Sequence, residues 1–294
     1  MSDTLTKRSL RIAVAGATGQ IGSALLSKLV KEDVEIVALS RDPSTDRLPH
    51  GIAPMVVDFE KPSTLSTAVE GADQLFVAHG TSARQVENEI AVIDAAVAAG
   101  VAHIVKVSVM GPPVRLHPFD WHAKIEAHLA TRDVGYTLLR PSTFVDILKR
   151  RAAFVAQGTW GGAAGEGRVN LIDTRDVADV ALAVLLNQEN LQAQRAYHLT
   201  GPASVSMPEV AAELSRLLGA QISYDHRTPE EHRKVLLEAG LSEMIADLQL
   251  GLDRLFKLSV QAETTSTVFE LTGQPPRSAF AWLKENLAAF QPVK

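Results

Sequence analysis

The chain has 294 residues, with 29 basic and 34 acidic side chains, for a formal net charge of −5 at pH 7. This length predicts one large domain or two small ones, and it suffices to bury a hydrophobic core. A mildly acidic total argues against nucleic acid and anionic membranes as partners, because both attract basic surfaces. The absence of cysteine excludes disulfide scaffolds, thiolate metal sites and thiol nucleophiles, and it fits a cytoplasmic location.

The first half alternates short apolar runs with helical patterns. The runs predict strands at Leu10–Ala15, Val34–Leu39, Met55–Phe59, Leu75–Ala78, Ile104–Val109 and Tyr136–Leu139. Between them, helices are expected at residues 21–29, Ser63–Glu70, Ala83–Ala99 and Phe119–Thr131. Continuous apolar strands separated by such helices are typical of βαβ units, so we expect an α/β fold with a doubly wound, Rossmann-like parallel sheet.

The second half is less regular and predicts a smaller α+β region. Strands are expected at Val169–Ile172 and Ala196–Leu199, with helices at Asp176–Leu186, Pro208–Leu218 and Ala279–Phe290. We expect a division into residues 1–148 and 149–294. No run reaches about 18 apolar residues, and the first residues lack the pattern of a signal peptide, so no membrane segment is expected.

A glycine-rich turn joins the first strand to the first helix. Residues 16–22 read Gly16-Ala17-Thr18-Gly19-Gln20-Ile21-Gly22. In such turns the first glycine permits the sharp bend, the second lets a pyrophosphate approach the backbone, and the third lets helix and strand pack closely. The free N–H groups of the helix N-terminus then face the anion. We therefore predict a dinucleotide site here; the alternative is a tight turn that binds nothing.

The end of the second strand bears on the choice of cofactor. An acidic residue there would bind the ribose 2′-hydroxyl of NAD, but Ser40 holds the expected position and Arg41 follows it. Arg41 can pair with a 2′-phosphate through charge-assisted hydrogen bonds, which favours NADP(H) over NAD(H). Asp42 is the counter-argument, since the register is uncertain by a residue, and Arg41 as an ordinary surface arginine is the alternative.

Other strand ends supply further candidates, because ligands of this fold lie outside the carboxyl ends of the strands. Asp58 and Phe59 end the third strand, where the adenine is expected. His79 and Gly80 end the fourth, at the edge of the ribose and pyrophosphate. Ser108 follows the fifth, where it would contact cofactor or substrate or would be a plain strand-end serine.

The chain resembles the NmrA-like branch of the atypical short-chain dehydrogenases/reductases from about residue 10 to about residue 290. The resemblance rests on the glycine turn with Arg41 and on three further segments, which are Val107–Gly111, His117–Leu129 and Tyr136–Phe144. Weaker family-like segments are Asn170–Ala178 and Leu271–Pro276. By resemblance, Pro141, Ser142 and Phe144 would lie in the loop that wraps the nicotinamide.

The chain departs from ordinary short-chain dehydrogenases in its proton donor. Those enzymes use Tyr-x-x-x-Lys, yet four residues after Tyr136, Tyr197 and Tyr224 stand arginine, glycine and threonine. The resemblance puts His122 in its place, since the quinone and dye reductases of the branch carry histidine there. His122 and Glu126 share a helix face, so the carboxylate would orient the imidazole or raise its pKa. The alternative is that His122 only caps or hydrogen-bonds the nicotinamide carboxamide, or lies on the surface.

The resemblance implies an oxidoreductase that transfers a hydride from NADP(H) to a small conjugated acceptor, such as a quinone or a dye. The alternative is an NmrA-like NADP(H)-binding redox sensor that acts through a protein partner, and a sugar-nucleotide epimerase is disfavoured by the missing dyad. The histidine spacing predicts no metal site. Trp160, beside Gly161 and Gly162, is expected to form a mobile lid over the substrate. The chain would be a monomer or a homodimer.

Overall fold

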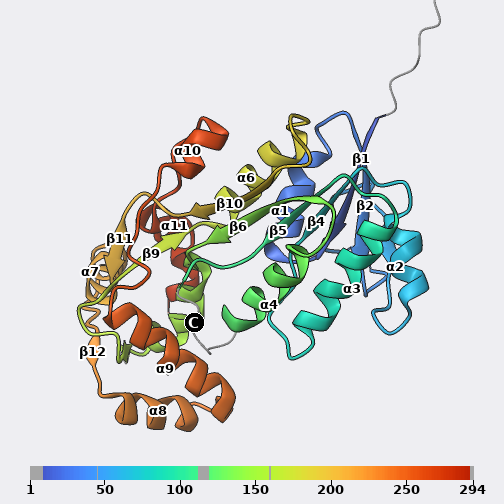
Figure 1. Cartoon of the computed structure of the whole chain (residues 1–294). Helices are drawn as coiled ribbons and strands as arrows, with labels where there is room; N and C mark the ends of the chain where they lie inside the picture. Colours follow the sequence, from blue (N-terminus) through green and yellow to red (C-terminus); the bar gives the residue numbers. More distant parts are fainter. Residues whose placement is uncertain (1–8, 45, 112–118, 159, 292–294) are drawn as a thin grey trace, which may run out of the picture. The chain divides into compact units, whose positions relative to one another are not determined.

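The computed structural model describes residues 9–44, 46–111, 119–158 and 160–291. The chain forms two compact units (Figure 1). The first holds the chain up to Ser108 together with Trp121–Leu139 and Ala178–Tyr197. The second holds Val109–Asp120, Arg140–Val177 and the chain from His198 onward. This grouping follows the packing of the chain, and the division at residue 148 stays a prediction.

A seven-stranded sheet lies mainly in the first unit, in the order β10–β6–β5–β4–β1–β2–β3. Every strand pairing from β6 to β3 is parallel. The chain moves outward from β1 to β3 and then starts again at β4 on the other side, which is the doubly wound arrangement. The predicted fold class is confirmed. The strands are β1 (Leu10–Ala15), β2 (Val34–Ser40), β3 (Pro54–Val56), β4 (Gln74–Val77), β5 (His103–Val107), β6 (Gly135–Pro141) and β10 (Gln194–Leu199).

The helices between these strands begin and end within a few residues of the predicted ranges. They are α1 (Gln20–Leu29), α2 (Pro62–Val69), α3 (Gln85–Ala98), α4 (Phe119–Leu129) and α6 (Thr174–Leu186). Strand β3 is shorter than the predicted Met55–Phe59. The reason is local: the Asp58 backbone N–H donates to Thr64 Oγ1 at 2.9 Å, so it makes no ladder bond there.

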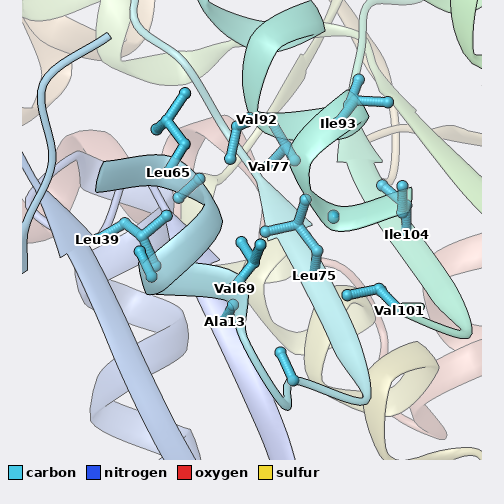
Figure 2. Close-up of a cluster of buried hydrophobic side chains, with 14 of the residues drawn as sticks. Ala13, Leu39, Leu65, Val69, Leu75, Val77, Val92, Ile93, Val101 and Ile104 are labelled. Carbon is cyan, nitrogen blue, oxygen red and sulfur yellow. The ribbon is translucent and has the colours of Figure 1, made fainter. Parts of the chain in front are cut away.

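The core of the first unit fills the space between the sheet and the helices α2 and α3 (Figure 2). Leu75 and Val77 alternate with residues on the other face of β4, as expected for a strand buried on both sides. Leu65 and Val69 of α2 meet Val92 of α3 in the same cluster. Burial of these aliphatic side chains stabilises the sheet. The loops at one edge of this sheet carry the candidate site residues.

The second unit has two small sheets, β11–β9–β7 and β12–β8, and its own core. Helix α7 begins with a capping box, in which Ser206 and Glu209 exchange hydrogen bonds between side chain and backbone. The remaining elements are β7 (Thr143–Phe144), η1 (Val145–Arg151), α5 (Ala152–Ala156), β8 (Gly161–Gly162), β9 (Arg168–Ile172), β11 (Ser204–Ser206), α7 (Met207–Leu218), β12 (Asp225–His226), α8 (Pro229–Glu238), α9 (Glu243–Lys257), α10 (Thr267–Thr272), α11 (Ala279–Glu285) and η2 (Leu287–Phe290).

Trp160 does not form the lid that the sequence predicts. Only 3% of its surface is exposed, and its ring meets the edge of Tyr224 with centroids 5.5 Å apart. It belongs to the hydrophobic core of the second unit. The neighbouring glycines have a packing reason, since a Cβ on Gly162 would lie 2.4 Å from the Tyr224 hydroxyl. The glycine–tryptophan segment is therefore structural.

Candidate active site

The glycine turn after β1 has the backbone geometry that a dinucleotide site needs. Gly16 has a φ of +88°, and a Cβ there would lie 1.9 Å from the carbonyl oxygen of Ala78. A Cβ on Gly22 would lie 2.1 Å from the Gly16 carbonyl oxygen, so only glycine lets α1 pack this closely on the turn. Gly19 is the N-cap of α1 and offers no side-chain cap. The first N–H groups of α1 therefore stay available to a ligand.

A cavity of about 310 Å³ opens at this turn. It brings together seven of the residues predicted to bind the cofactor, which are Gly16, Thr18, Gly19, Arg41, Phe59, His79 and Gly80. Gln20, Ile21 and Gly22 form the first turn of α1 and do not line it. The cavity lies at the carboxyl ends of β1, β2 and β4, where doubly wound sheets bind nucleotides.

The cavity fits an anionic dinucleotide on its own geometry. One wall is backbone that no Cβ could enter, next to the positive end of a helix dipole. Two arginines, Arg41 and Arg47, line another part of it. Its size is within the range of small-molecule sites, and it continues toward a second cavity of about 730 Å³ through the shared residues Arg41, Val57, Phe59 and Ser82.

Asp58 lines the second cavity, and Phe59 lines both. The Asp58 carboxylate accepts from the Glu60 backbone N–H at 2.9 Å and lies 3.2 Å from Lys61 Nζ. These contacts lower the pKa of Asp58, with the backbone hydrogen bond as the largest cause, so the group is an ionised acceptor at neutral pH. This is the state in which it would accept from an adenine amino group.

His79 has a fixed ring in the first cavity. Its Nδ1 lies 2.6 Å from the Gly80 carbonyl oxygen, which can only accept, so the proton is on Nδ1. Its Nε2 then accepts from Asn88 Nδ2 at 3.1 Å. The ring also meets the edge of Phe59, with centroids 6.0 Å apart. His79 and Phe59 thus form a rigid, partly apolar wall.

His122 lies on α4 with a polar group at each ring nitrogen. Its Nδ1 is 3.0 Å from Lys106 Nζ, and its Nε2 is 3.3 Å from the amide nitrogen of Gln85. Lys106 is fully buried and pairs with buried Glu89 at 2.9 Å. Gln85 donates to the other oxygen of Glu89 at 2.9 Å. Three elements, α3, β5 and α4, thus contribute to one network, defined here as Gln85, Glu89, Lys106 and His122.

The expected effect of Glu126 on His122 is wrong in direction. Burial lowers the pKa of His122 well below its usual value, and the positive charge of Lys106 lowers it further. Glu126 accepts a hydrogen bond from Ser108 Oγ at 2.5 Å. Ser108 is buried, and its hydroxyl group donates its hydrogen bond to that carboxylate. Toward a ligand, the Ser108 oxygen could therefore only accept a hydrogen bond. The roles of Ser108 and His122 in catalysis stay predictions.

Pro141, Ser142 and Phe144 lie in the second unit. The Ser142 hydroxyl donates to Asn170 Oδ1 at 3.3 Å, and its backbone N–H donates to the Leu199 carbonyl at 2.8 Å. Pro141 ends β6, and Phe144 ends β7 with a half-buried ring. Their contact with the nicotinamide stays a prediction. Of the segment His117–Leu129 used for the resemblance, His117 and Pro118 lie outside the described residues.

Arg47 and the pair formed by Lys106 and Glu89 were not predicted from the sequence. Arg47 lines the cavity at the glycine turn from a loop without a motif, so nothing in the sequence singles it out. Lys106 did leave a signal, because it is the one charged residue in the buried strand His103–Val107. A lysine is almost never fully buried without a partner, so its position predicts a buried acidic residue nearby. Which acidic residue, Glu89, required the structure.

Among the residues that the structure describes, no cluster of three histidine, aspartate or glutamate side chains is arranged to hold a metal ion. In the same part of the chain, no helix is both long enough and apolar enough to cross a membrane.

A doubly wound sheet with this turn and cavity defines a nucleotide-binding protein of the Rossmann-like class. The comparison with protein families specifies it: residues 16–188 match the family described as NAD(P)H-binding, and the chain belongs to that family. A protein of Xenophilus azovorans named NAD(P)H azoreductase is 32% identical to this chain over 286 residues, which cover 95% of this chain and 99% of that protein. The resemblance to atypical short-chain dehydrogenases/reductases is confirmed.

Solved structures agree over nearly the whole chain. The crystal structure of an NADPH-dependent quinone oxidoreductase from Escherichia coli, complexed with NADPH, matches with a TM-score of 0.85 and 27% identity. The match covers 94% of this chain and 99% of that one. The triphenylmethane reductase of Citrobacter sp. matches with a TM-score of 0.83 and 25% identity, covering 96% and 99% of the two chains.

Proposed function

We propose that this chain is an NAD(P)H-dependent reductase of small conjugated acceptors such as quinones and dyes. The observation that carries the proposal is the cavity at the glycine turn, with backbone N–H groups and two arginines for the phosphates, in a chain of the NAD(P)H-binding family. The similarity to an azoreductase, a quinone oxidoreductase and a triphenylmethane reductase supports this class of acceptor.

We further propose that NADP(H) is preferred over NAD(H). Arg41 and Arg47 both line the cavity where β2 ends, and a 2′-phosphate would accept from either guanidinium. Asp42, the counter-argument in the sequence, uses its carboxylate to accept from the Ser44 backbone N–H at 2.9 Å. Its own N–H donates to Ser40 Oγ at 3.1 Å, which fixes Ser40 and turns Asp42 into the loop.

The residues of this chain bind and orient more than they transfer protons. The glycine turn, Arg41 and Arg47 would hold the phosphates, and Asp58 and Phe59 would hold the adenine. When bound, the reduced nicotinamide supplies the hydride. Acceptors of the proposed class delocalise the incoming charge, so orientation supplies much of the rate without a tyrosine–lysine pair. His122 is neutral at neutral pH, since its pKa is lowered, and it would act as a hydrogen-bond donor.

Oxidation of reduced cofactor, followed by its absorbance, tests the proposal. NADPH and NADH are offered in parallel with quinones, azo compounds and cationic dyes, using wild type and His122→Ala. We expect turnover with NADPH in wild type, and a lower kcat for oxygen-bearing acceptors in the variant. Tight NADPH binding with no turnover of any acceptor would contradict the proposal and would favour a redox sensor with a protein partner.

A further inference from the structure

Lys106 is the most unusual residue of the first unit, because its ammonium group lies in the centre of the sheet. It is 0% exposed and sits on β5 between apolar neighbours. Its Nζ has three contacts: Glu89 Oε2 at 2.9 Å, the Val107 carbonyl oxygen at 2.9 Å and His122 Nδ1 at 3.0 Å. An ammonium group has three hydrogens and no lone pair, so it donates in all three contacts.

This arrangement fixes the tautomer of His122. Because Lys106 donates to Nδ1, that nitrogen must carry a lone pair. A neutral imidazole carries one proton, which is therefore on Nε2. The usual assignment of tautomers from hydrogen-bond partners is ambiguous when the partner can both give and accept, but a lysine ammonium cannot accept. The charge of the ammonium is in turn balanced by Glu89.

The proton on Nε2 has no good acceptor in the network. The nearest group is the amide nitrogen of Gln85 at 3.3 Å, an NH2 group with one of its two hydrogens donated to Glu89 Oε1 at 2.9 Å. An amide nitrogen accepts no hydrogen bond. Exchanging the amide oxygen and nitrogen would place the Gln85 oxygen 2.9 Å from the carboxylate oxygen of Glu89, so two acceptors would face each other. His122 is half-buried, and no group of the network accepts from its Nε2–H.

We infer that Lys106, held by Glu89, is a positioning residue that fixes His122 as a neutral imidazole with its proton on Nε2, directed to an acceptor atom of the substrate. The inference deepens the proposed function and rests on it for the nature of the substrate. It also selects among substrates: a quinone oxygen or azo nitrogen gains negative charge on reduction and is stabilised by a donor. A triphenylmethane cation is reduced at carbon, loses its charge and has no such need.

The charged groups around His122 support this assignment. Lys106 on β5 and Glu89 on α3 form a neutral pair, and Glu126 lies one turn further along α4, where it accepts from Ser108. Burial and the Lys106 charge keep the pKa of His122 well below its usual value, so a second proton is absent at neutral pH. A neutral N–H donor, not an imidazolium, is the state that the ring presents.

The first test is the ¹⁵N NMR spectrum of histidine-labelled protein, with His122 assigned through His122→Gln. We expect its shifts to be those of the neutral Nε2–H tautomer, unchanged between about pH 6 and pH 8. In the double variant Glu89→Gln/Lys106→Met, which leaves no unpaired buried charge, we expect a mixture of tautomers. A wild-type ring that is protonated on Nδ1, or that titrates in this range, would overturn the inference.

The second test compares acceptors in the same variants. In Glu89→Gln/Lys106→Met we expect kcat to fall by about 10- to 100-fold for a quinone and by little for a triphenylmethane dye. Full removal of one preorganised donor costs about 100- to 1,000-fold, and a mixture of tautomers keeps part of that donor. Lys124→Met, which removes an exposed lysine of α4, is the matched control. Equal losses for quinone and dye would show a structural role only and would overturn the inference. If wild type turned over none of the acceptors, the proposed function would be refuted. The tautomer of His122 would then be decided by the NMR test alone.

Discussion

The glycine turn after β1 and the network around Lys106 lie in the same unit but are built by opposite means. The turn is made of backbone, and its parts are seven consecutive residues, Gly16 to Gly22. The network is made of side chains from α3, β5 and α4, which the chain brings together only after folding. The turn selects a ligand by shape and free N–H groups, whereas the network controls where one proton is held.

The largest expected effect concerns the buried ion pair of the network. Lys106→Met leaves the Glu89 carboxylate buried without its partner, and we expect a loss of about 3–5 kcal/mol in the free energy of unfolding. The double variant Glu89→Gln/Lys106→Met removes both charges, and we expect it to be more stable than the single variant. Urea unfolding measures wild type, the single variants Lys106→Met and Glu89→Gln, and the double variant. A double variant that shows the sum of the two single losses would mean that the charges do not stabilise one another.

The turn is tested by a pair of glycines with nearly the same backbone angle. Gly16 and Gly51 have φ values of +88° and +87°, but a Cβ meets Ala78 only at Gly16 and meets nothing within 4 Å at Gly51. We expect Gly51→Ala to lose about 1 kcal/mol through backbone strain alone, and Gly16→Ala to lose roughly 3 kcal/mol through strain and overlap. NADPH binding should weaken only in Gly16→Ala. Equal losses of stability would mean that the overlap is relieved at no cost.

The contrast explains how much the sequence could predict. The sheet, the turn and seven of the cavity residues follow from strand and glycine patterns, because a parallel sheet places its carboxyl ends at one edge. The sequence predicted a raised pKa for His122, because Glu126 is the acidic neighbour that helical spacing indicates; in the structure the pKa of His122 is lowered. Lys106 acts from another strand, and helical spacing cannot reveal a neighbour from a different element. The predicted lid at Trp160 was wrong for the same reason. The adjacent glycines suggested mobility, but Trp160 packs against Tyr224, a residue distant in the sequence.

The cavity offers a smaller effect, on the choice between the two cofactors. In Arg41→Ser we expect the Kd for NADPH to rise by about tenfold, which corresponds to one charge-assisted hydrogen bond, while the Kd for NADH stays the same. Arg254→Ala is the control, because Arg254 is exposed on α9 of the second unit and lines neither cavity. Fluorescence titration measures both constants. A parallel rise for NADH would assign Arg41 to the pyrophosphate or ribose.

The smallest effect is the pH dependence of stability that His122 contributes. Its pKa is lowered in the folded chain from a usual value of 6.5, so as the pH falls through 6.5 the unfolded chain gains a proton that the folded chain does not. The free energy of unfolding must then decrease toward acid pH, by at most about 1.4 kcal/mol per pH unit from this residue. The contribution is fully present above the unfolded pKa and is lost below it.

Unfolding of wild type and His122→Gln by urea at several pH values isolates this contribution as the difference between the two curves. The difference is needed because buried His232, whose pKa is lowered to about 4, and His103 add slopes of the same sign. The exposed His50, changed to Gln, serves as the control. A difference curve that is flat below pH 6.5 would mean that His122 takes up a proton in the folded state. In that case Lys106 would not keep His122 neutral, and the ring would become an imidazolium in the folded chain at acid pH.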